Sequence, residues 1–168
     1  MNEFENLSDL HREYTYRLQN TLESIPSELI VITPESGWSF YQIFDHIVQV
    51  ESRIFGFITS GKKQEPKLNW ETRRLHKAMT NRSYKVSSPE PFLPKSRESW
   101  SELYEKWQSM RSQLEHRISV GSIYFDDEEM LHPILGSLTR MDWFYVFYFH
   151  GERHRLQMEE LMERLASA

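Results

Sequence analysis

Residues 139–165 read TRMDWFYVFYFHGERHRLQMEELMERL, and this stretch predicts one long helix. Thr139 and Asp142 have the spacing of a helix cap, with an acidic side chain at the positive end of the helix dipole. One broad face then repeats at steps of three and four residues, the period of an α-helix. It comprises Trp143, Phe147, His150, His154, Met158, Leu161 and Leu165. Four charged residues are expected away from that face: Glu152, Arg155, Glu159 and Glu163.

Two earlier stretches show the same period and predict two helices nearer the N-terminus. The first covers residues 4–25 and ends before Pro26. The second begins at Ser39, which forms a capping-box pattern with Gln42, and closes at residues 61–62. The inward stripe of the second helix comprises Ile43, His46, Ile47, Val50 and Ile54.

The segments between the helices differ in what they predict. Residues 62–95 contain four prolines, which cannot lie inside a long uninterrupted helix, so they predict a long crossover. The middle of this crossover, residues 70–81, has no proline or glycine and leaves room for a short helix. Another capping box opens a helix over residues 99–118. Residues 120–137 contain two glycines, a proline and an acidic run, and they predict a second connection without regular structure.

Four helices of about 20 residues, each with one apolar side, predict an all-α fold. The expected architecture is a four-helix bundle with a long crossover between the second and third helices. No alternating strand pattern competes with this interpretation. The chain has 168 residues, the size of one ordinary domain, and no internal repeat or boundary divides it. We therefore expect residues 1–168 to form a single domain.

The composition excludes several classes of protein. An apolar share of 39% and an aromatic share of 14% exclude a mainly disordered chain. The 20 Lys and Arg residues against 25 Asp and Glu residues give a net charge of −5, so we expect no nucleic-acid partner. The absence of cysteine excludes disulfides and thiolate metal sites, and any thiol chemistry needs an external thiol. Neither a secretory signal nor a membrane span is visible, so we expect a soluble, cytoplasmic protein.

Three histidines suggest a metal site. His150 and His154 stand four residues apart on one helix face, so both imidazoles can reach one metal ion. His46 lies on the inward stripe of the second helix, where a bundle ordinarily places an aliphatic side chain. Together they offer three neutral nitrogen ligands and leave a position for water or substrate. The alternative is three hydrogen-bonded core histidines, and spacing alone leaves the two interpretations even.

These same segments resemble a known family, the DinB-like (DinB/YfiT) superfamily. Residues 37–47, GWSFYQIFDHI, are similar to its Trp-Ser and downstream His signature. Residues 132–136, HPILG, and 150–157, HGERHRLQ, resemble its closing His-Pro turn and its His-x-x-x-His-x-x-Gln helix. Residues 61–87 match only in length and character, and Gly151 stands where the family often has an acidic residue. The resemblance covers nearly the whole chain.

The resemblance implies a four-helix bundle in which His46, His150 and His154 hold a divalent metal. Nitrogen-only ligation favours zinc or nickel and also tolerates iron or manganese. Family members include metal-dependent enzymes that act on small molecules, among them thiol S-transferases that use bacillithiol or mycothiol and a thiol-dependent isomerase. A small-molecule substrate, with a low-molecular-weight thiol as cosubstrate if the reaction is a transfer, is therefore implied for this chain.

The reaction itself stays open at this point. A divalent ion on three neutral imidazoles activates either water or a thiol, which leaves a hydrolase and a thiol S-transferase. The alternative from another class is a non-catalytic, metal-stabilised binding or stress-response module. Gln157 is spaced to hydrogen-bond, and so orient, a ligand ring or a metal-bound water, with a helix-surface position equally open. Glu51 is a conceivable base but is expected on a solvated flank, so no catalytic residue is assigned.

The remaining candidates have mainly structural interpretations. His132 precedes a proline in a connection, which favours a turn role over a fourth ligand. Three other histidines are expected to be exposed or hydrogen-bonded locally: His11, His76 and His116. Residues 143–149, WFYVFYF, are apolar all around the helix, so one side faces the core and another faces a partner subunit or the crossover. This run makes a homodimer the favoured assembly.

Overall fold

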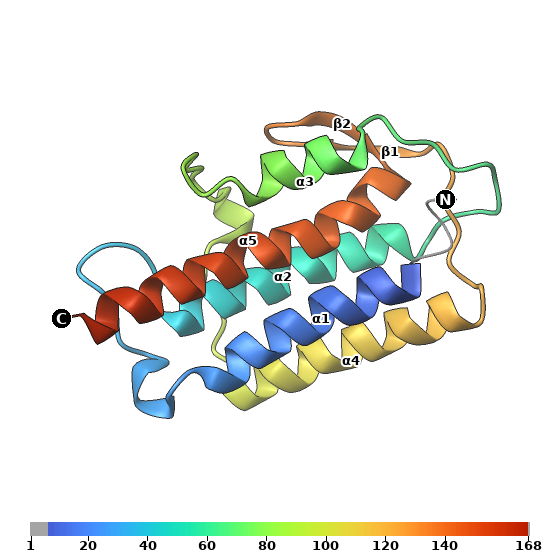
Figure 1. Cartoon of the computed structure of the whole chain (residues 1–168). Coiled ribbons are helices and arrows are strands. Elements are labelled where there is room, and N and C mark those ends of the chain that lie inside the picture. The colour runs from blue at the N-terminus through green and yellow to red at the C-terminus, as the bar shows by residue number, and fades with distance from the viewer. Residues whose placement is uncertain (1–6, 168) are drawn as a thin grey trace.

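The computed structural model describes residues 7–167, and the fold is mostly helical (Figure 1). Its helices are α1 (Leu7–Ser24), α2 (Phe40–Ile58), α3 (Thr72–Thr80), α4 (Trp100–Ser119) and α5 (Arg140–Ala166), with single 3₁₀ turns η1 (Ser27–Leu29) and η2 (Glu90–Phe92). Two strands, β1 (Glu129–His132) and β2 (Gly136–Thr139), lie between α4 and α5. The predicted helix start at residue 4 falls outside the described residues.

All three helix starts predicted from capping patterns are confirmed. In each pair, the side chain of the first residue accepts from the backbone N–H of the second, and the second side chain accepts in return from the first backbone N–H. The pairs are Ser39 with Gln42, Ser99 with Glu102, and Thr139 with Asp142. Capping is a local interaction between residues three apart, so the sequence alone is enough to locate it.

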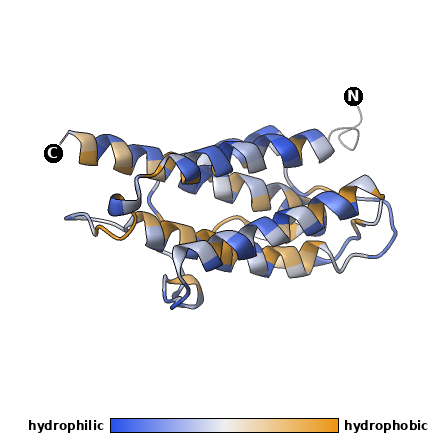
Figure 2. Cartoon of the chain, turned by 90° about the horizontal axis from the view of Figure 1, so that it is seen from below, coloured by the Kyte–Doolittle hydropathy of each residue, from blue (hydrophilic) through white to orange (hydrophobic). Residues whose placement is uncertain are grey.

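The four long helices lie side by side (Figure 1). Helices α1 and α2 each contact both α4 and α5, which closes a ring around one core. Each long helix turns a fully buried apolar side chain inward: Leu18, Phe44, Trp107 and Phe147. Figure 2 shows hydrophilic and hydrophobic faces on the same helices, the pattern expected when one stripe packs inward. None of the described helices is both long and apolar enough to span a bilayer.

The segment before α5 differs from the prediction. Strands β1 and β2 pair antiparallel, with Glu129 opposite Thr139 and His132 opposite Gly136. The expectation of a connection without regular structure is therefore wrong here, and the all-α prediction omits a small sheet. Each strand is only four residues long, too short for alternation to be visible in the sequence. Gly136 has a φ of +79°, a conformation that favours glycine, and it completes the turn.

Two buried carboxylates fix the crossover between α2 and α4. Asp45 on α2 accepts hydrogen bonds from the backbone N–H groups of residues 95 and 96 at 2.8 and 3.0 Å. Asp142 on α5 accepts from the backbone N–H groups of residues 69 and 70 at 3.0 and 3.2 Å. Such charge-assisted bonds are stronger than neutral ones. The crossover is therefore held at both ends, and α3 packs along α5.

The aromatic run of α5 is buried within this chain. Residues 143–149 are each at most 6% exposed, because the core covers one side and the crossover helix α3 with the hairpin covers the other. Trp143 also donates its indole N–H to the Met130 carbonyl at 3.0 Å, which attaches the hairpin to α5. The sequence left either a partner subunit or the crossover as the neighbour of the second side, and the crossover is the one observed. A homodimer stays a prediction.

Several polar side chains expected at the surface are buried instead. Glu51 is fully buried and accepts hydrogen bonds from Arg111 and from the Trp107 indole, so the predicted solvated flank is wrong. His11 is also buried, and its Nδ1 lies 2.9 Å from the Tyr148 hydroxyl, which contradicts exposure or local bonding. The partners are at least 56 residues away in the chain, beyond the reach of a periodicity argument.

Two charges on α5 depart from the prediction in the same way. Glu152 and Arg155 are both buried, although their positions on the helix predict a solvated side. They pair with each other at 2.7 Å, and Arg17 of α1 pairs with Glu152 as well. Because α1 packs on this side of α5, these charges are removed from water and compensate one another.

Candidate metal centre

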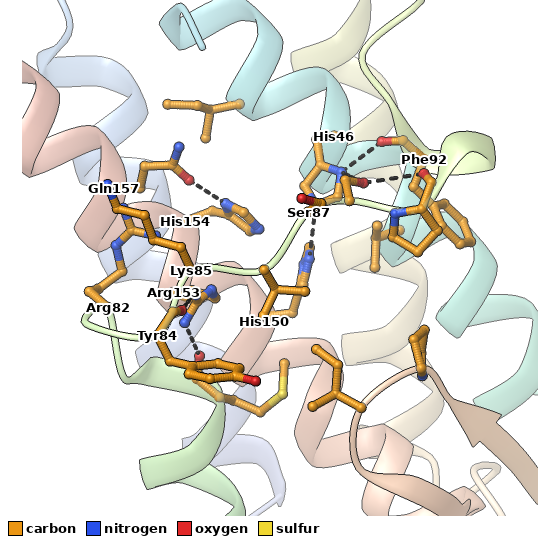
Figure 3. Close-up of a pocket in the computed structure, with 18 of the residues that line it drawn as sticks. His46, Arg82, Tyr84, Lys85, Ser87, Phe92, His150, Arg153, His154 and Gln157 are labelled. Carbon is orange, nitrogen blue, oxygen red and sulfur yellow. Dashed lines mark hydrogen bonds between the residues drawn. The ribbon is translucent and has the colours of Figure 1, made fainter. Parts of the chain in front are cut away.

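The structure brings the three predicted histidines together (Figure 3). His46 comes from α2, and His150 and His154 come from consecutive turns of α5. One nitrogen from each ring lies within 4.8 Å of those of the other two, and the Nε2 atoms of His46 and His150 are 3.1 Å apart. Helices α2 and α5 pack directly against each other, which is the adjacency that spacing within one sequence cannot show.

Two of the three rings are fixed by hydrogen bonds to oxygen atoms. His46 Nδ1 donates to the Phe92 backbone carbonyl of the crossover at 2.8 Å, and His154 Nδ1 donates to Oε1 of Gln157 at 2.7 Å (Figure 3). These oxygens only accept, so the proton of each neutral ring resides on Nδ1 and the Nε2 lone pair is left available. This is the arrangement that orients histidine ligands of metals. Of the two positions left open for Gln157, a hydrogen bond to a histidine ring is the one observed.

His150 is held differently from its two neighbours. Its Nδ1 is buried without a hydrogen-bond partner among residues 7–167. Because His46 carries its proton on Nδ1, the 3.1 Å contact between the two Nε2 atoms requires His150 to donate there. Three imidazole nitrogens therefore meet at one place with a single proton among them. This donor set fits a divalent cation, with the nitrogens of His46, His150 and His154 as its ligands.

Burial keeps these imidazoles neutral. It lowers the pKa of His46, and it lowers the pKa values of His150 and His154 much further below the ordinary range. Repulsion from the neighbouring imidazoles adds to the effect at His150 and His154, while the Phe92 carbonyl partly opposes it at His46. Neutral rings are the form that binds a metal ion, so no ring has to lose net charge at neutral pH. For His150 to bind through Nε2, its proton has to move from Nε2 to Nδ1, which has no partner among residues 7–167.

A cavity of about 1450 Å³ opens beside the three histidines. Its walls come from α2, α5, the crossover and the hairpin, and the ring of Trp38 lies 5.1 Å from that of His46. The cavity exceeds the volume of a typical small-molecule site. The nitrogen cluster therefore borders open space and is not enclosed on all sides by protein.

Carboxylates are scarce around this cavity. Among the described residues that line it, only Glu160 and Glu163 are acidic, and Glu160 is paired with Arg82 at 2.9 Å. Glu51, the conceivable base of the sequence analysis, lies between α2 and α4 and does not line the cavity. Among the described residues, no carboxylate joins the three histidines in their cluster, so none is placed there as a general base.

The other histidines do not join the cluster. Nδ1 of His132 accepts the backbone N–H groups of Ile134 and Leu135, both at 3.2 Å, and so closes the turn of the hairpin. The predicted structural role of His132 is confirmed. Its ring stands in the cavity wall beside Trp143 with its centroid 5.4 Å from that of the indole, and burial lowers its pKa.

Two contributions to the site leave no signal in the sequence. The Phe92 carbonyl orients His46, but a backbone acceptor can come from any residue type. Arg153 donates to three carbonyls of the crossover, those of Met79, Asn81 and Tyr84, at 2.6–3.1 Å. This arginine fixes the cavity wall next to His154, and its sequence position alone predicts only a charged helix surface.

Comparison with known proteins agrees with this geometry. The sequence profile of the DinB superfamily matches residues 10–158. The chain belongs to the DinB superfamily. The matched range contains the three histidines and Gln157, so the resemblance stated from the sequence motifs is confirmed. A DinB-superfamily chain with three converging histidines has the ligand set to hold a metal ion.

One curated relative is similar over most of its length. The "Uncharacterized protein YuaE" of Bacillus subtilis (strain 168) is 25% identical over 153 residues, which are 89% of this DinB-superfamily chain and 93% of the relative. No solved structure matches the chain.

Proposed function

We propose that this protein is a metal-dependent enzyme that acts on a small molecule, with His46, His150 and His154 as ligands of a divalent ion. Zinc and nickel suit nitrogen-only ligation best, and iron and manganese are also accommodated. The observation that carries the proposal is the convergence of three neutral imidazole nitrogens within 4.8 Å beside a large cavity. The ring of four long helices, with the crossover over one side, supports a four-helix-bundle architecture for this site.

The reaction class follows from which groups are present. A divalent ion on three neutral ligands lowers the pKa of a water or a thiol that it binds. The chain has no cysteine, and among residues 7–167 no carboxylate joins the histidine cluster, so the nucleophile comes from solution and ionises without a protein base in that cluster. A thiol, with an ordinary pKa near 8.5, ionises far more easily than water. We therefore favour a thiol S-transferase that takes a low-molecular-weight thiol, and we place a hydrolase second.

Metal analysis tests the first half of this proposal. After extensive dialysis the wild-type protein is expected to retain a divalent metal, and the His46→Ala and His154→Ala variants are expected to lose it. His116→Ala is the matched control, because His116 is exposed on α4 and lies outside the cluster. Equal metal content in all four proteins would remove the basis of the proposal.

Turnover assays separate the reaction classes. The metal-loaded protein is incubated with a thiol and 1-chloro-2,4-dinitrobenzene, and separately with nitrophenyl esters. Thiol consumption that is lost in His46→Ala supports the transferase, in which the sulfur bonds to carbon, chloride leaves and the thiol proton passes to solvent. Ester cleavage without thiol consumption supports the hydrolase. If neither occurs and metal removal lowers the melting temperature, a non-catalytic module replaces the enzyme.

A further inference from the structure

The cavity wall is unusually apolar where it meets solvent. Ten large apolar side chains are exposed among the described residues, and half of them line this single cavity. They are Tyr84, Val86, Leu93, Leu131 and Ile134. The first three come from the crossover and the last two from the hairpin. Exposed apolar groups that cluster around a cavity mark a surface that a ligand covers.

The charge of the wall is opposite to that of the chain. Five cationic and two anionic side chains line the cavity, whereas the whole chain has 20 basic and 25 acidic residues. The cations are Arg53, Arg82, Lys85, Arg153 and Arg164, and the acids are Glu160 and Glu163. A positively charged cavity in a negatively charged chain concentrates anionic ligands.

Most of these cations are occupied or distant from the histidines. Arg82 pairs with Glu160, and Arg153 donates to crossover carbonyls. Arg53 and Arg164 follow the nearest histidine of their own helices by seven and ten residues, or roughly 10 and 15 Å along the axis. Lys85 has no hydrogen-bond or ion-pair partner among residues 7–167. Figure 3 shows it beside Arg82 on the side of the cavity where His154 and Gln157 lie.

We propose that the substrate is an amphipathic organic anion, a carboxylate or phosphate group joined to an apolar body. Lys85 holds the anionic group on the His154 side, and the apolar body lies against the exposed side chains of the crossover and hairpin. Calling this ligand the substrate rests on the proposed function. The binding preference itself depends only on the charge and apolarity of the wall.

Calorimetric titration with three probes of equal chain length tests the preference: octanoate, octanol and octylammonium. Octanoate is expected to bind most tightly and octylammonium most weakly. Lys85→Met should weaken octanoate binding about fivefold and Lys85→Glu about tenfold or more, with octanol binding unchanged. Lys77→Met is the matched control, since Lys77 is an exposed lysine on α3 outside the cavity wall, and it should change none of the affinities.

Titrations of metal-loaded and chelator-treated protein distinguish the two proposals, because a carboxylate also binds a metal directly. An octanoate preference that depends on Lys85 in both forms supports the anion site, even if dialysis shows that no metal is retained. Equal binding of the three probes, or a preference for octylammonium, overturns it. An octanoate preference that survives Lys85→Glu overturns the assignment of the anionic group to Lys85.

Discussion

Helices α2 and α5 contribute side chains to two buried polar clusters that differ in how their members are hydrogen-bonded. In the Glu51 cluster, formed by Glu51, Trp107, Arg111, His11 and Tyr148, both carboxylate oxygens have donors and the histidine has a hydroxyl partner. In the histidine cluster, three nitrogens converge with one proton among them, next to a cavity. Buried histidine therefore does not identify a metal site by itself. Nitrogens that meet with too few protons to bond to one another are the feature that supports the proposed metal site.

The two clusters are close neighbours on α5, and Gly151 separates them. A Cβ atom at position 151 would lie 2.9 Å from Oε1 of Glu51, so a side chain here would displace the carboxylate from Arg111. This accounts for glycine at position 151, since a carboxylate side chain there would meet that of Glu51. The Glu51 cluster and the close packing of α5 on α2 therefore both depend on the absence of a side chain at position 151.

The largest expected effect comes from breaking the Glu51 cluster. Glu51→Ala leaves the Arg111 guanidinium buried without its carboxylate, so the free energy of unfolding should fall by about 3–5 kcal/mol, measured by urea denaturation. The double variant Glu51→Leu/Arg111→Met should recover most of that loss because it removes both charges. His46→Ala in metal-free protein should cost less, since no ion pair is broken. A Glu51→Ala protein as stable as wild type would contradict this interpretation.

A smaller effect is expected from the titration of His11. Burial and the nearby Arg111 lower its pKa to about 3, so below its ordinary value of 6.5 the unfolded chain takes up a proton that the folded chain refuses. Stability is therefore lost as the pH falls from 6.5 toward 3, by about 2 kcal/mol at pH 5. His11→Gln keeps a hydrogen-bonding side chain but does not titrate.

The comparison of two pH profiles isolates this contribution. Urea denaturation at pH 7 and pH 5, both with chelator, should show that wild type loses about 2 kcal/mol more than His11→Gln over the interval. An equal loss of unfolding free energy in the two proteins would mean that His11 is already protonated in the folded state at pH 5. In that case His11 would not be the neutral, hydrogen-bonded member of the Glu51 cluster that its 2.9 Å contact with the Tyr148 hydroxyl indicates.

The sequence predicted those parts of the molecule that depend on local interactions. Three capping boxes and the inward stripes located the long helices, and the stripe positions of His46, His150 and His154 were enough to nominate the site. The contacts between residues far apart in the sequence were not predictable. The hairpin strands are too short to show alternation, and the Glu51 and Arg111 partners are 60 residues apart. The Phe92 carbonyl that orients His46 belongs to the backbone, which carries no residue signal.

The smallest expected effect concerns the part of the histidine cluster that is already satisfied. Gln157 holds the Nδ1 proton of His154, so Gln157→Leu should leave the fold intact and weaken metal affinity about tenfold, measured by competition with a chromogenic chelator. Gln157→Glu should retain or strengthen binding, because a carboxylate accepts the same proton and adds negative charge near the ligand. Equal affinity in Gln157→Leu and wild type would mean that His154 is oriented by packing alone. In that case the 2.7 Å hydrogen bond between His154 and Gln157 would not help to hold the histidine cluster in place.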